Sequence, residues 1–293
     1  MKLGLHLNSF NWEGGPARFA ERLGDIGAAA EAAGFDSIAV ADHVWLSPWM
    51  GGPEGPHPEA YTTLAFLAAK TSRVKLMTLV TAASYRHPGM LAKTVTTLDV
   101  LSGGRTWLGI GAGDDEPEAR GLGLPFPPLG ERFALLEEAL QVCLQMWAGA
   151  QGDERPFEGP AHRLERPLNL PQSLSRPHPP ILIGGDGERR TLQLVARYAD
   201  AAGLRPTPEL PHKLEVLRKH CEAEGRDYEA IEKTCVFAFD VGADGSKVDE
   251  LLGRLRWMAS MGIQTVIGRV PDVDRIEPLE AIGRRVIPAV ADL

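Results

Sequence analysis

The residues best suited to chemistry follow an apolar segment at 106–111. Glycines occupy alternate positions there and four carboxylates come soon after: Gly109, Gly111, Gly113, Asp114, Asp115, Glu116 and Glu118. Alternate glycines let the backbone approach a flat or anionic ligand, because no Cβ atom stands in the way. The spacing G-x-G-x-G differs from the dinucleotide-binding fingerprint, and the run from Asp114 to Pro117 predicts that no helix opens at once. Repulsion among the carboxylates should raise the pKa of at least one and keep a proton available, the alternative being a solvated acidic loop.

A second candidate is the imidazole of His43, which follows Asp42 at the end of an apolar run. An imidazole at a strand end could act as a base, an acid or a hydrogen-bond donor, or could simply bond to a loop. Trp45 and Trp49 could form an aromatic wall beside it or pack on the rim. His43 and the nearby acids lack metal-ligand spacing, so we predict no metal site.

A third candidate is an anion site in the segment 181–192. An apolar run leads there through Gly184, Gly185 and Gly187 into a helix start that carries Arg189 and Arg190. Free N–H groups at a helix N-terminus, with arginine charge beside them, favour an anion such as phosphate. A tight strand-to-helix turn without a ligand is the alternative.

Alternating strands and helices must position these candidates. Short apolar runs predict eight strands, at 2–8, 35–42, 74–81, 106–111, 180–184, 200–204, 234–241 and 263–269. A helical segment follows each strand, at 16–33, 58–71, 88–101, 130–149, 188–198, 208–224, 246–261 and 275–289. Eight strands that each have a helix predict a (β/α)8 TIM barrel, because short apolar strands suit a parallel sheet buried on both faces. An open doubly wound sheet is the alternative.

We interpret residues 1–293 as one barrel domain with insertions at its C-terminal mouth. The proline-rich segment 150–179 has no clear periodicity and could be an insertion that acts as a lid. Barrel sites lie at the carboxyl ends of the strands. The candidates would therefore face one mouth, together with other strand-end residues: Asn8, Asp42, His43, Thr78–Thr81, Gly111–Glu116, Gly184–Arg190 and Arg205.

The composition limits the classes of partner and the cellular compartment that we expect for this chain. The net charge of -8 without a Lys/Arg run argues against nucleic acid. No apolar stretch approaches the length of a membrane span, and the N-terminus resembles a strand rather than a secretion signal. Three dispersed cysteines, Cys143, Cys221 and Cys235, favour a reducing cytoplasm.

Six motifs, in order along residues 1–290, resemble those of the luciferase-like monooxygenase superfamily. They are Asp42-His43, Tyr85-Arg86-His87-Pro88, Asp99-x-Leu101-Ser102-x-Gly104-Arg105, Gly109-x-Gly111-x-Gly113, Gly130-Glu131-Arg132-Phe133 and Ile183-Gly184-Gly185. More narrowly, the set is similar to the branch that uses the deazaflavin coenzyme F420. The resemblance implies a (β/α)8 barrel with extra segments near the mouth, a homodimer, and an isoalloxazine-like ring over the end of the third strand.

The resemblance also implies roles for particular residues. His43 matches the catalytic histidine near the ring, and Asp114 stands where deazaflavin members often carry a glutamate acid, one methylene longer. Leu79-Val80 matches a bulge that in relatives holds a non-proline cis peptide under the ring. The remaining cofactor-binding candidates are Asp42, Thr81, Gly111, Gly113, Gly184, Gly185, Gly187 and Arg189. The substrate-binding candidates are Asn8, Trp45 and Trp49.

The implied function is hydride transfer between F420 and a small organic substrate. One alternative is a monooxygenase that uses FMN, a supplied reductant and oxygen. Another is a non-catalytic flavin-binding protein. A cofactor-free phosphosugar isomerase or lyase could use the anion site at 184–190, although the chain has no clear catalytic lysine at a strand end.

Overall fold

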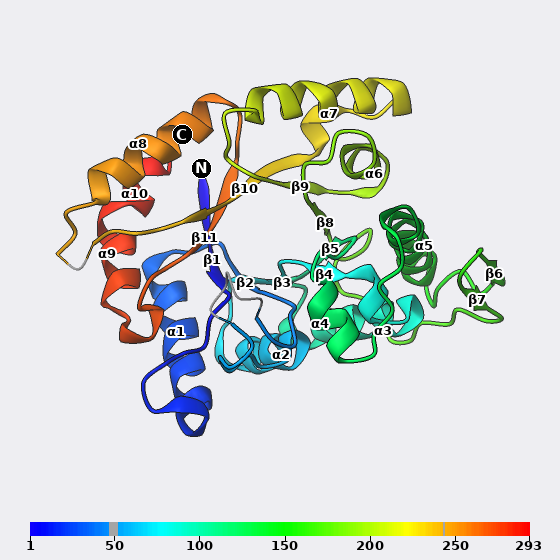
Figure 1. Ribbon diagram of the computed structural model, residues 1–293, viewed down its shortest axis with the longest axis horizontal. Helices are drawn as coiled ribbons and strands as arrows, with labels where there is room; N and C mark the ends of the chain where they lie inside the picture. Colours follow the sequence, from blue (N-terminus) through cyan, green and yellow to red (C-terminus); the bar gives the residue numbers. More distant parts are fainter. Residues whose placement is uncertain (47–51, 243) are drawn as a thin grey trace.

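Eight parallel strands form a closed ring in the computed structural model, which describes residues 1–46, 52–242 and 244–293. Around the ring the strands are β1 (Lys2–Leu7), β2 (Ser37–Val40), β3 (Lys75–Thr78), β5 (Thr106–Gly111), β8 (Ile181–Gly184), β9 (Ala201–Leu204), β10 (Glu232–Ala238) and β11 (Thr265–Arg269). The last strand pairs with the first, with Leu3 opposite Val266 (Figure 1). This closure confirms the predicted barrel and excludes the open sheet.

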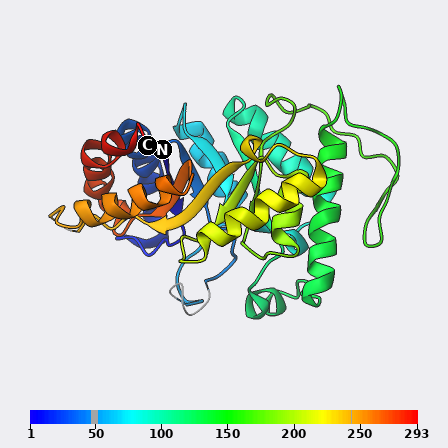
Figure 2. The same ribbon diagram turned by 90° about the horizontal axis from the view of Figure 1, so that it is seen from above.

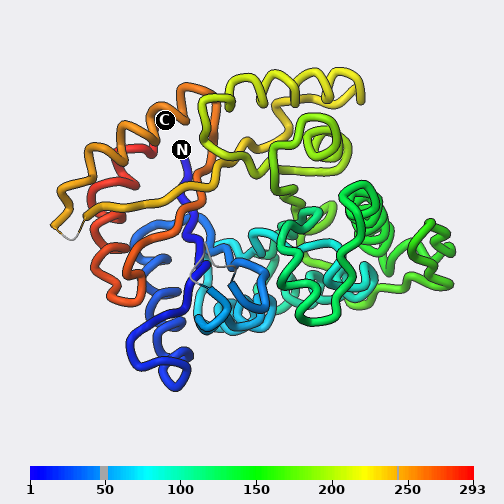
Figure 3. The backbone as a smooth tube through the Cα atoms, in the orientation of Figure 1, coloured from blue at the N-terminus to red at the C-terminus, as the bar shows by residue number. Residues whose placement is uncertain are grey.

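Helices surround the ring on its outside (Figure 2). They are α1 (Phe19–Ala33), α2 (Ala60–Lys70), α3 (Pro88–Ser102), α5 (Leu129–Trp147), α6 (Thr191–Tyr198), α7 (Leu210–Glu224), α8 (Val248–Ser260), α9 (Glu277–Arg285) and α10 (Ile287–Val290). Local signals set their ends: α3 begins at Pro88 and ends before Gly103, whose φ of 73° stops a helix. The tube in Figure 3 follows the chain once round, so that α9 comes back beside α1.

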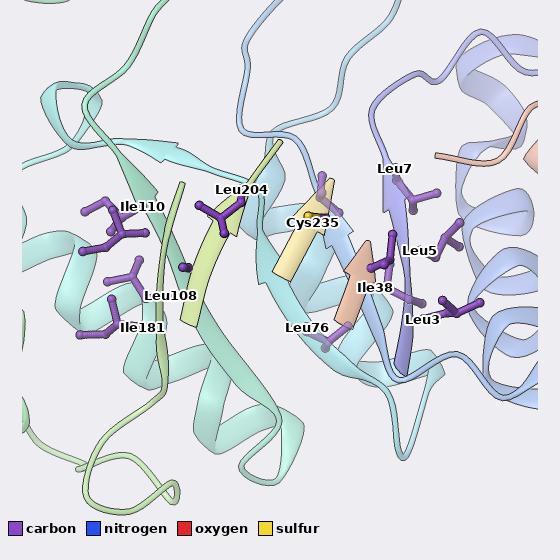
Figure 4. Close-up of a cluster of buried hydrophobic side chains, with 14 of the residues drawn as sticks. Leu3, Leu5, Leu7, Ile38, Leu76, Leu108, Ile110, Ile181, Leu204 and Cys235 are labelled. Carbon is purple, nitrogen blue, oxygen red and sulfur yellow. The ribbon is translucent and has the colours of Figure 1, made fainter. Parts of the chain in front are cut away.

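The main core lies between the strands and the helices. Leu3, Leu5 and Leu7 alternate along β1 and are buried on its helix-facing side (Figure 4). The intervening residues of the strands face the barrel interior, where Met77, Leu182 and Ile267 belong to a separate small apolar cluster. The period of two therefore sends every second strand residue toward the centre of the barrel.

The interior positions are unequal around the ring. Toward the mouth, β5, β8 and β9 present Gly109, Gly111, Gly184 and Gly203, whereas β1 presents His6. These glycines bring no side chain to the centre, which leaves room for the backbone after β3 and for Val80 to pack against them. The candidate site lies on this side of the barrel mouth.

No helix opens directly after β5, but the loop predicted between β5 and the helix at 130–149 contains a short one. A short helix, α4 (Glu116–Gly121), begins directly after Asp115, whose carboxylate accepts a hydrogen bond from the Glu118 backbone N–H at 3.0 Å. Pro117 fits because the first turn of a helix needs no donor from its own N–H groups. The pattern Asp115-x-x-Glu118 is a capping-box sequence that announces this helix.

The segment 150–179 runs over the outside of α3 and α5. It contains a small antiparallel pair, β6 (Phe157–Glu158) and β7 (Arg163–Leu164), seen at the edge of the molecule beside α5 in Figure 1. The carboxylate of Glu138 in α5 accepts hydrogen bonds from the backbone N–H groups of Ala161 and His162. A role of this segment as a lid stays a prediction.

Each helix in the described ranges is too short or too polar to span a lipid bilayer.

Candidate functional site

A cavity of about 670 Å³ opens at the carboxyl ends of the strands. Most of the residues named from the sequence line it: Asp42, His43, Leu79, Val80, Gly111, Gly113, Asp114, Gly184, Gly185 and Gly187. The expectation that loops from neighbouring strands converge on one mouth is therefore confirmed. Tyr85, Phe133, Arg205 and His6 also line the cavity.

The floor on one side is a bulge between β3 and β4 (Thr81–Ala82). The peptide bond between Leu79 and Val80 is cis, as the resemblance implied. Val80 sits against the interior glycines: a Cβ atom on Gly184 would lie 2.9 Å from its Cγ1, and one on Gly111 would lie 3.0 Å from its Cγ2. Both positions need glycine because the bulge fills the space that a side chain would take.

His43 is held by Glu118, a buried carboxylate on α4. The Nδ1 atom of His43 lies 2.8 Å from Glu118 Oε2, and the other oxygen of Glu118 accepts from the backbone N–H of Val44. A carboxylate can only accept, so Nδ1 carries the hydrogen and Nε2 is the nitrogen left for a ligand. The side chain of His43 is about one-fifth exposed and that of Glu118 is inaccessible.

The charges of this pair shift both pKa values. Burial alone would lower the pKa of His43, but the hydrogen bond and charge of Glu118, with help from Asp114 and Asp115, raise it above 6.5. Burial would raise the pKa of Glu118, but hydrogen bonds from His43, Val44 and Tyr85 lower it. The expected rise in the pKa of a carboxylate thus does not occur at Glu118, because donors surround it.

Tyr85 completes this group on the cavity wall. Its hydroxyl donates to Glu118 Oε2 at 2.8 Å. Burial and the nearby carboxylates, Glu118 first, raise the pKa of Tyr85 far above its usual value, so the phenol stays protonated. The result is a fixed chain from Tyr85 through Glu118 to the imidazole of His43.

Asp42 lines the cavity, but hydrogen bonds from neighbouring side chains occupy its carboxylate. Arg86 donates to both of its oxygens, with 2.9 Å between Nη2 and Oδ1, and the Thr81 hydroxyl donates to Oδ2 at 2.7 Å. Tyr61 contacts Thr81 in turn, at 2.9 Å. Thr81 therefore lies behind the cavity wall and holds Asp42 in place, and this contact anchors the end of β2.

The acidic residues after β5 differ in their surroundings. Asp114 is exposed and lines the cavity, whereas Asp115 is buried and caps α4. Asp115, Glu118 and His43 place their ligand atoms within 4.8 Å of one another, a spacing that a metal ion would accept. The hydrogen bonds among these residues account for this short spacing without a metal ion.

The turn after β8 forms the opposite wall. Gly185 has a φ of 114°, which favours glycine, and Gly187 packs against Thr191 at the start of α6. Asp186 accepts two hydrogen bonds from Arg205, at 2.8 and 3.0 Å, and these lower the pKa of Asp186. The arginine at this wall is Arg205, while Arg189 lies in the turn before α6, where it is exposed and outside the lining.

His6 reaches the cavity from β1. Its Nε2 atom is buried and has no hydrogen-bond partner among the described residues. Burial, followed by the charges of His43, His57 and Arg269, lowers the pKa of His6 to about 4. This imidazole is therefore neutral at physiological pH and has an unused polar atom.

The two predicted substrate residues that the structure describes, Asn8 and Trp45, lie outside the lining of the first cavity. Asn8 lines a second cavity, of about 480 Å³, which shares His6 with the first. The indole of Trp45 packs on α4, where a Cβ atom on Gly121 would lie 2.2 Å from its ring. Trp49 lies outside the described residues.

Sequence reasoning missed Glu118 as the partner of His43, and also His6 and Tyr85 as cavity residues. It placed Arg205 at the mouth but did not predict the contact of Arg205 with Asp186. The capping-box pattern could have located Glu118 on a helix. The parity of β1, on which His6 and Asn8 alternate with buried leucines, could have placed His6 inside the barrel.

This chain is similar in sequence to proteins of a known family. Residues 1–283 match the profile of a family described as luciferase-like monooxygenase. An F420-dependent glucose-6-phosphate dehydrogenase from Nakamurella multipartita is 34% identical over 218 residues, covering 72% of this chain and 60% of the relative. The chain thus spans less than two thirds of the length of that relative.

Two solved structures share the fold over almost their whole length. A monooxygenase from Streptomyces bottropensis superposes with a TM-score of 0.80 at 20% identity, covering 98% of this chain and 99% of its own. The coenzyme F420-dependent tetrahydromethanopterin reductase from Methanopyrus kandleri superposes with a TM-score of 0.79 at 18% identity, covering 98% of each chain.

Proposed function

Because the chain belongs to the luciferase-like monooxygenase family, we propose that it is an oxidoreductase that transfers a hydride between coenzyme F420 and a small organic substrate. The names of its relatives support the choice of F420. The observation that carries the proposal is one cavity that combines a cis-peptide bulge, a glycine-lined wall and an imidazole held by a buried carboxylate.

The residues around the cavity fit a planar ring with a phosphate-bearing tail. The volume lies within the range of cofactor sites, and Leu79 and Val80 offer an apolar surface beside the interior glycines. At the other end, Gly185 and Gly187 bring the backbone close to the cavity at the start of α6, beside Arg205. Backbone N–H groups at a helix start and a guanidinium suit phosphate oxygens.

The chemistry would be divided between cofactor and protein. A bound deazaflavin supplies hydride transfer and does not readily pass single electrons or activate oxygen. The protein's part is the proton that accompanies the hydride. Nε2 of His43 takes that proton from a hydroxyl, or returns it, while the Glu118 carboxylate stabilises the charged imidazolium. Asp114, exposed at the same mouth, exchanges the proton with solvent.

Assembly and compartment complete the proposal. The outer face of α3 carries two exposed apolar side chains, Met90 at 63% and Leu101 at 68% exposure, which lie on one stripe because they are eleven residues apart. We assign this stripe to a homodimer interface. The three cysteines are free and buried, which suits a cytoplasmic enzyme.

A binding titration tests the cofactor assignment. Purified protein is titrated separately with F420 and FMN while the fluorescence of each ring is followed. F420 should bind at least tenfold more tightly than FMN. Failure of both to bind below about 100 μM would overturn the proposal, and a preference for FMN with oxygen consumption would favour the monooxygenase alternative.

A further inference from the structure

The second cavity lies at the carboxyl ends of β1, β10 and β11, beside the main cavity. The two share His6 as a wall residue, and Val236 and Ala238 of β10 line one cavity each. A ligand that reacts near His43 could therefore extend past His6 into this second space. The unpartnered Nε2 atom of His6 stands at the junction.

The lining of the second cavity offers both donors and acceptors. Asn8 and Asn11 provide amide groups that do both, Arg269 provides a guanidinium, and Asp272 and Asp274 provide carboxylates. Arg269 forms no ion pair with a carboxylate in the described part of the chain. A ligand with several hydroxyl groups uses such a mixture well, because each hydroxyl both donates and accepts.

The charge balance disfavours an anionic ligand. Asp240 also lines this cavity, but Lys247 compensates its charge at 2.5 Å. Asp272 and Asp274 remain, against the single charge of Arg269. Among the described residues, the Asp274 carboxylate accepts a hydrogen bond from the Glu13 backbone N–H at 3.3 Å, and the Asp274 backbone carbonyl accepts one at 3.2 Å from Arg22, which lies outside the lining. A phosphate placed here would meet two carboxylates for one guanidinium, and like charges at short range repel.

We propose that the second cavity binds the uncharged, polyhydroxylated end of the substrate, that of a sugar or sugar alcohol without a phosphate, with His6 hydrogen-bonded to it at the junction. The inference deepens the proposed function, on which the assignment of the reacting end at His43 rests. The subsite itself depends only on the residues of β1, β11 and the loops after them.

Binding to the cofactor-free chain separates the two proposals. Glucose, mannitol and glucose-6-phosphate are each titrated into the protein by calorimetry, and crystals are soaked with the same probes. We expect glucose or mannitol to bind in the second cavity against Asn8 and Arg269, at least about tenfold more tightly than glucose-6-phosphate. Failure of F420 binding would leave this result unaffected.

A charge-neutralising variant makes the test sharper. Asp272→Asn combined with Asp274→Asn keeps the shape, and asparagine tolerates the left-handed backbone of Asp272, whose φ is 51°. The double variant should bind glucose-6-phosphate more tightly and the neutral sugar more weakly. The exposed pair Asp249→Asn with Asp292→Asn gives the same change in net charge and should change neither affinity.

Two results would overturn the inference. One is that no neutral polyol binds at millimolar concentration. The other is that the unsubstituted protein binds glucose-6-phosphate best, with its phosphate on Arg269.

Discussion

At the scale of single residues, the surroundings of each titratable side chain in the site determine how firmly it holds its proton. His43 has a raised pKa, His6 has a pKa of about 4, and Tyr85 stays protonated. The two imidazoles differ because a buried carboxylate partners only one of them. One side chain can therefore exchange a proton near neutral pH while the other offers a neutral hydrogen bond.

Glu118→Gln should separate positioning from proton transfer. The amide can still contact Nδ1 but carries no charge, so the pKa of His43 should fall and the pH profile of turnover should move to lower pH. Turnover should fall about tenfold to hundredfold, and His43→Ala should lose about 10²-fold or more while F420 affinity is kept.

The matched control is Glu116→Gln, an exposed carboxylate two residues away. Its pH profile should match that of the unsubstituted protein. A Glu118→Gln profile with an unchanged midpoint would remove Glu118 from this role.

His6 should make the fold sensitive to acid. The folded chain resists protonation of His6 until about pH 4, whereas the unfolded chain binds that proton near pH 6.5, so stability falls as pH drops through this window. A shift of this size corresponds to about 3 kcal/mol at most, by the linkage of pKa to free energy. Urea unfolding at pH 7 and pH 4.5 should lose less stability in His6→Gln than in the unsubstituted protein, and an equal loss would contradict the pKa of His6.

Sequence reasoning reached some of these residues and not others for a physical reason. His43 could be named because it stands at the end of an apolar strand, and Leu79-Val80 because the resemblance to the family implies a bulge there. The bond between His43 and Glu118 joins residues 75 apart in sequence, so it requires the positions of β2 and α4 in space. Arg189 was named as the cofactor-binding arginine because sequence spacing does not show which way a side chain points in the turn before α6.

At the scale of elements, the strand ends determine the shape of the cavity. The barrel strands were predictable to within a few residues, since a strand buried on both faces is a short apolar run. The small helix α4 and the β6–β7 pair were missed. Hydrogen bonds rather than a hydrophobic period hold them: Glu118 ties α4 to the loop after β2, and Glu138 ties the turn between β6 and β7 to α5.

The effects of substitutions at Gly184 and at Val80 in the bulge should depend on each other. Gly184→Ala places a Cβ atom 2.9 Å from Val80 Cγ1, so it should lower stability by about 1–3 kcal/mol and weaken F420 binding. Val80→Ala removes the colliding methyl groups, and the double variant should recover part of the loss in stability. Thermal unfolding and the F420 titration measure both effects, and purely additive losses would contradict the contact.

At the scale of the whole molecule, one closed barrel gathers residues of strands from β1 to β10 around one mouth. Met90 and Leu101 on α3 are exposed and lie outside the lining of that cavity. We propose that a homodimer buries these two side chains.

The dimer interface can be disrupted on that stripe alone. Met90→Glu combined with Leu101→Glu should convert a dimer to a monomer in light scattering, because two charges would be buried in an apolar contact. Leu122→Glu, at an exposed leucine on the mouth side, is the control and should stay dimeric. A monomeric unsubstituted protein would end this assignment.

The central claim is that the barrel mouth holds a deazaflavin between the Leu79-Val80 bulge and the imidazole of His43. A crystal structure of the complex with F420 tests it most directly. We predict density for the ring against Val80, with the Nε2 atom of His43 facing the reacting edge and the phosphate near Gly185 and Arg205. Density for the ring anywhere else on the molecule would contradict the account.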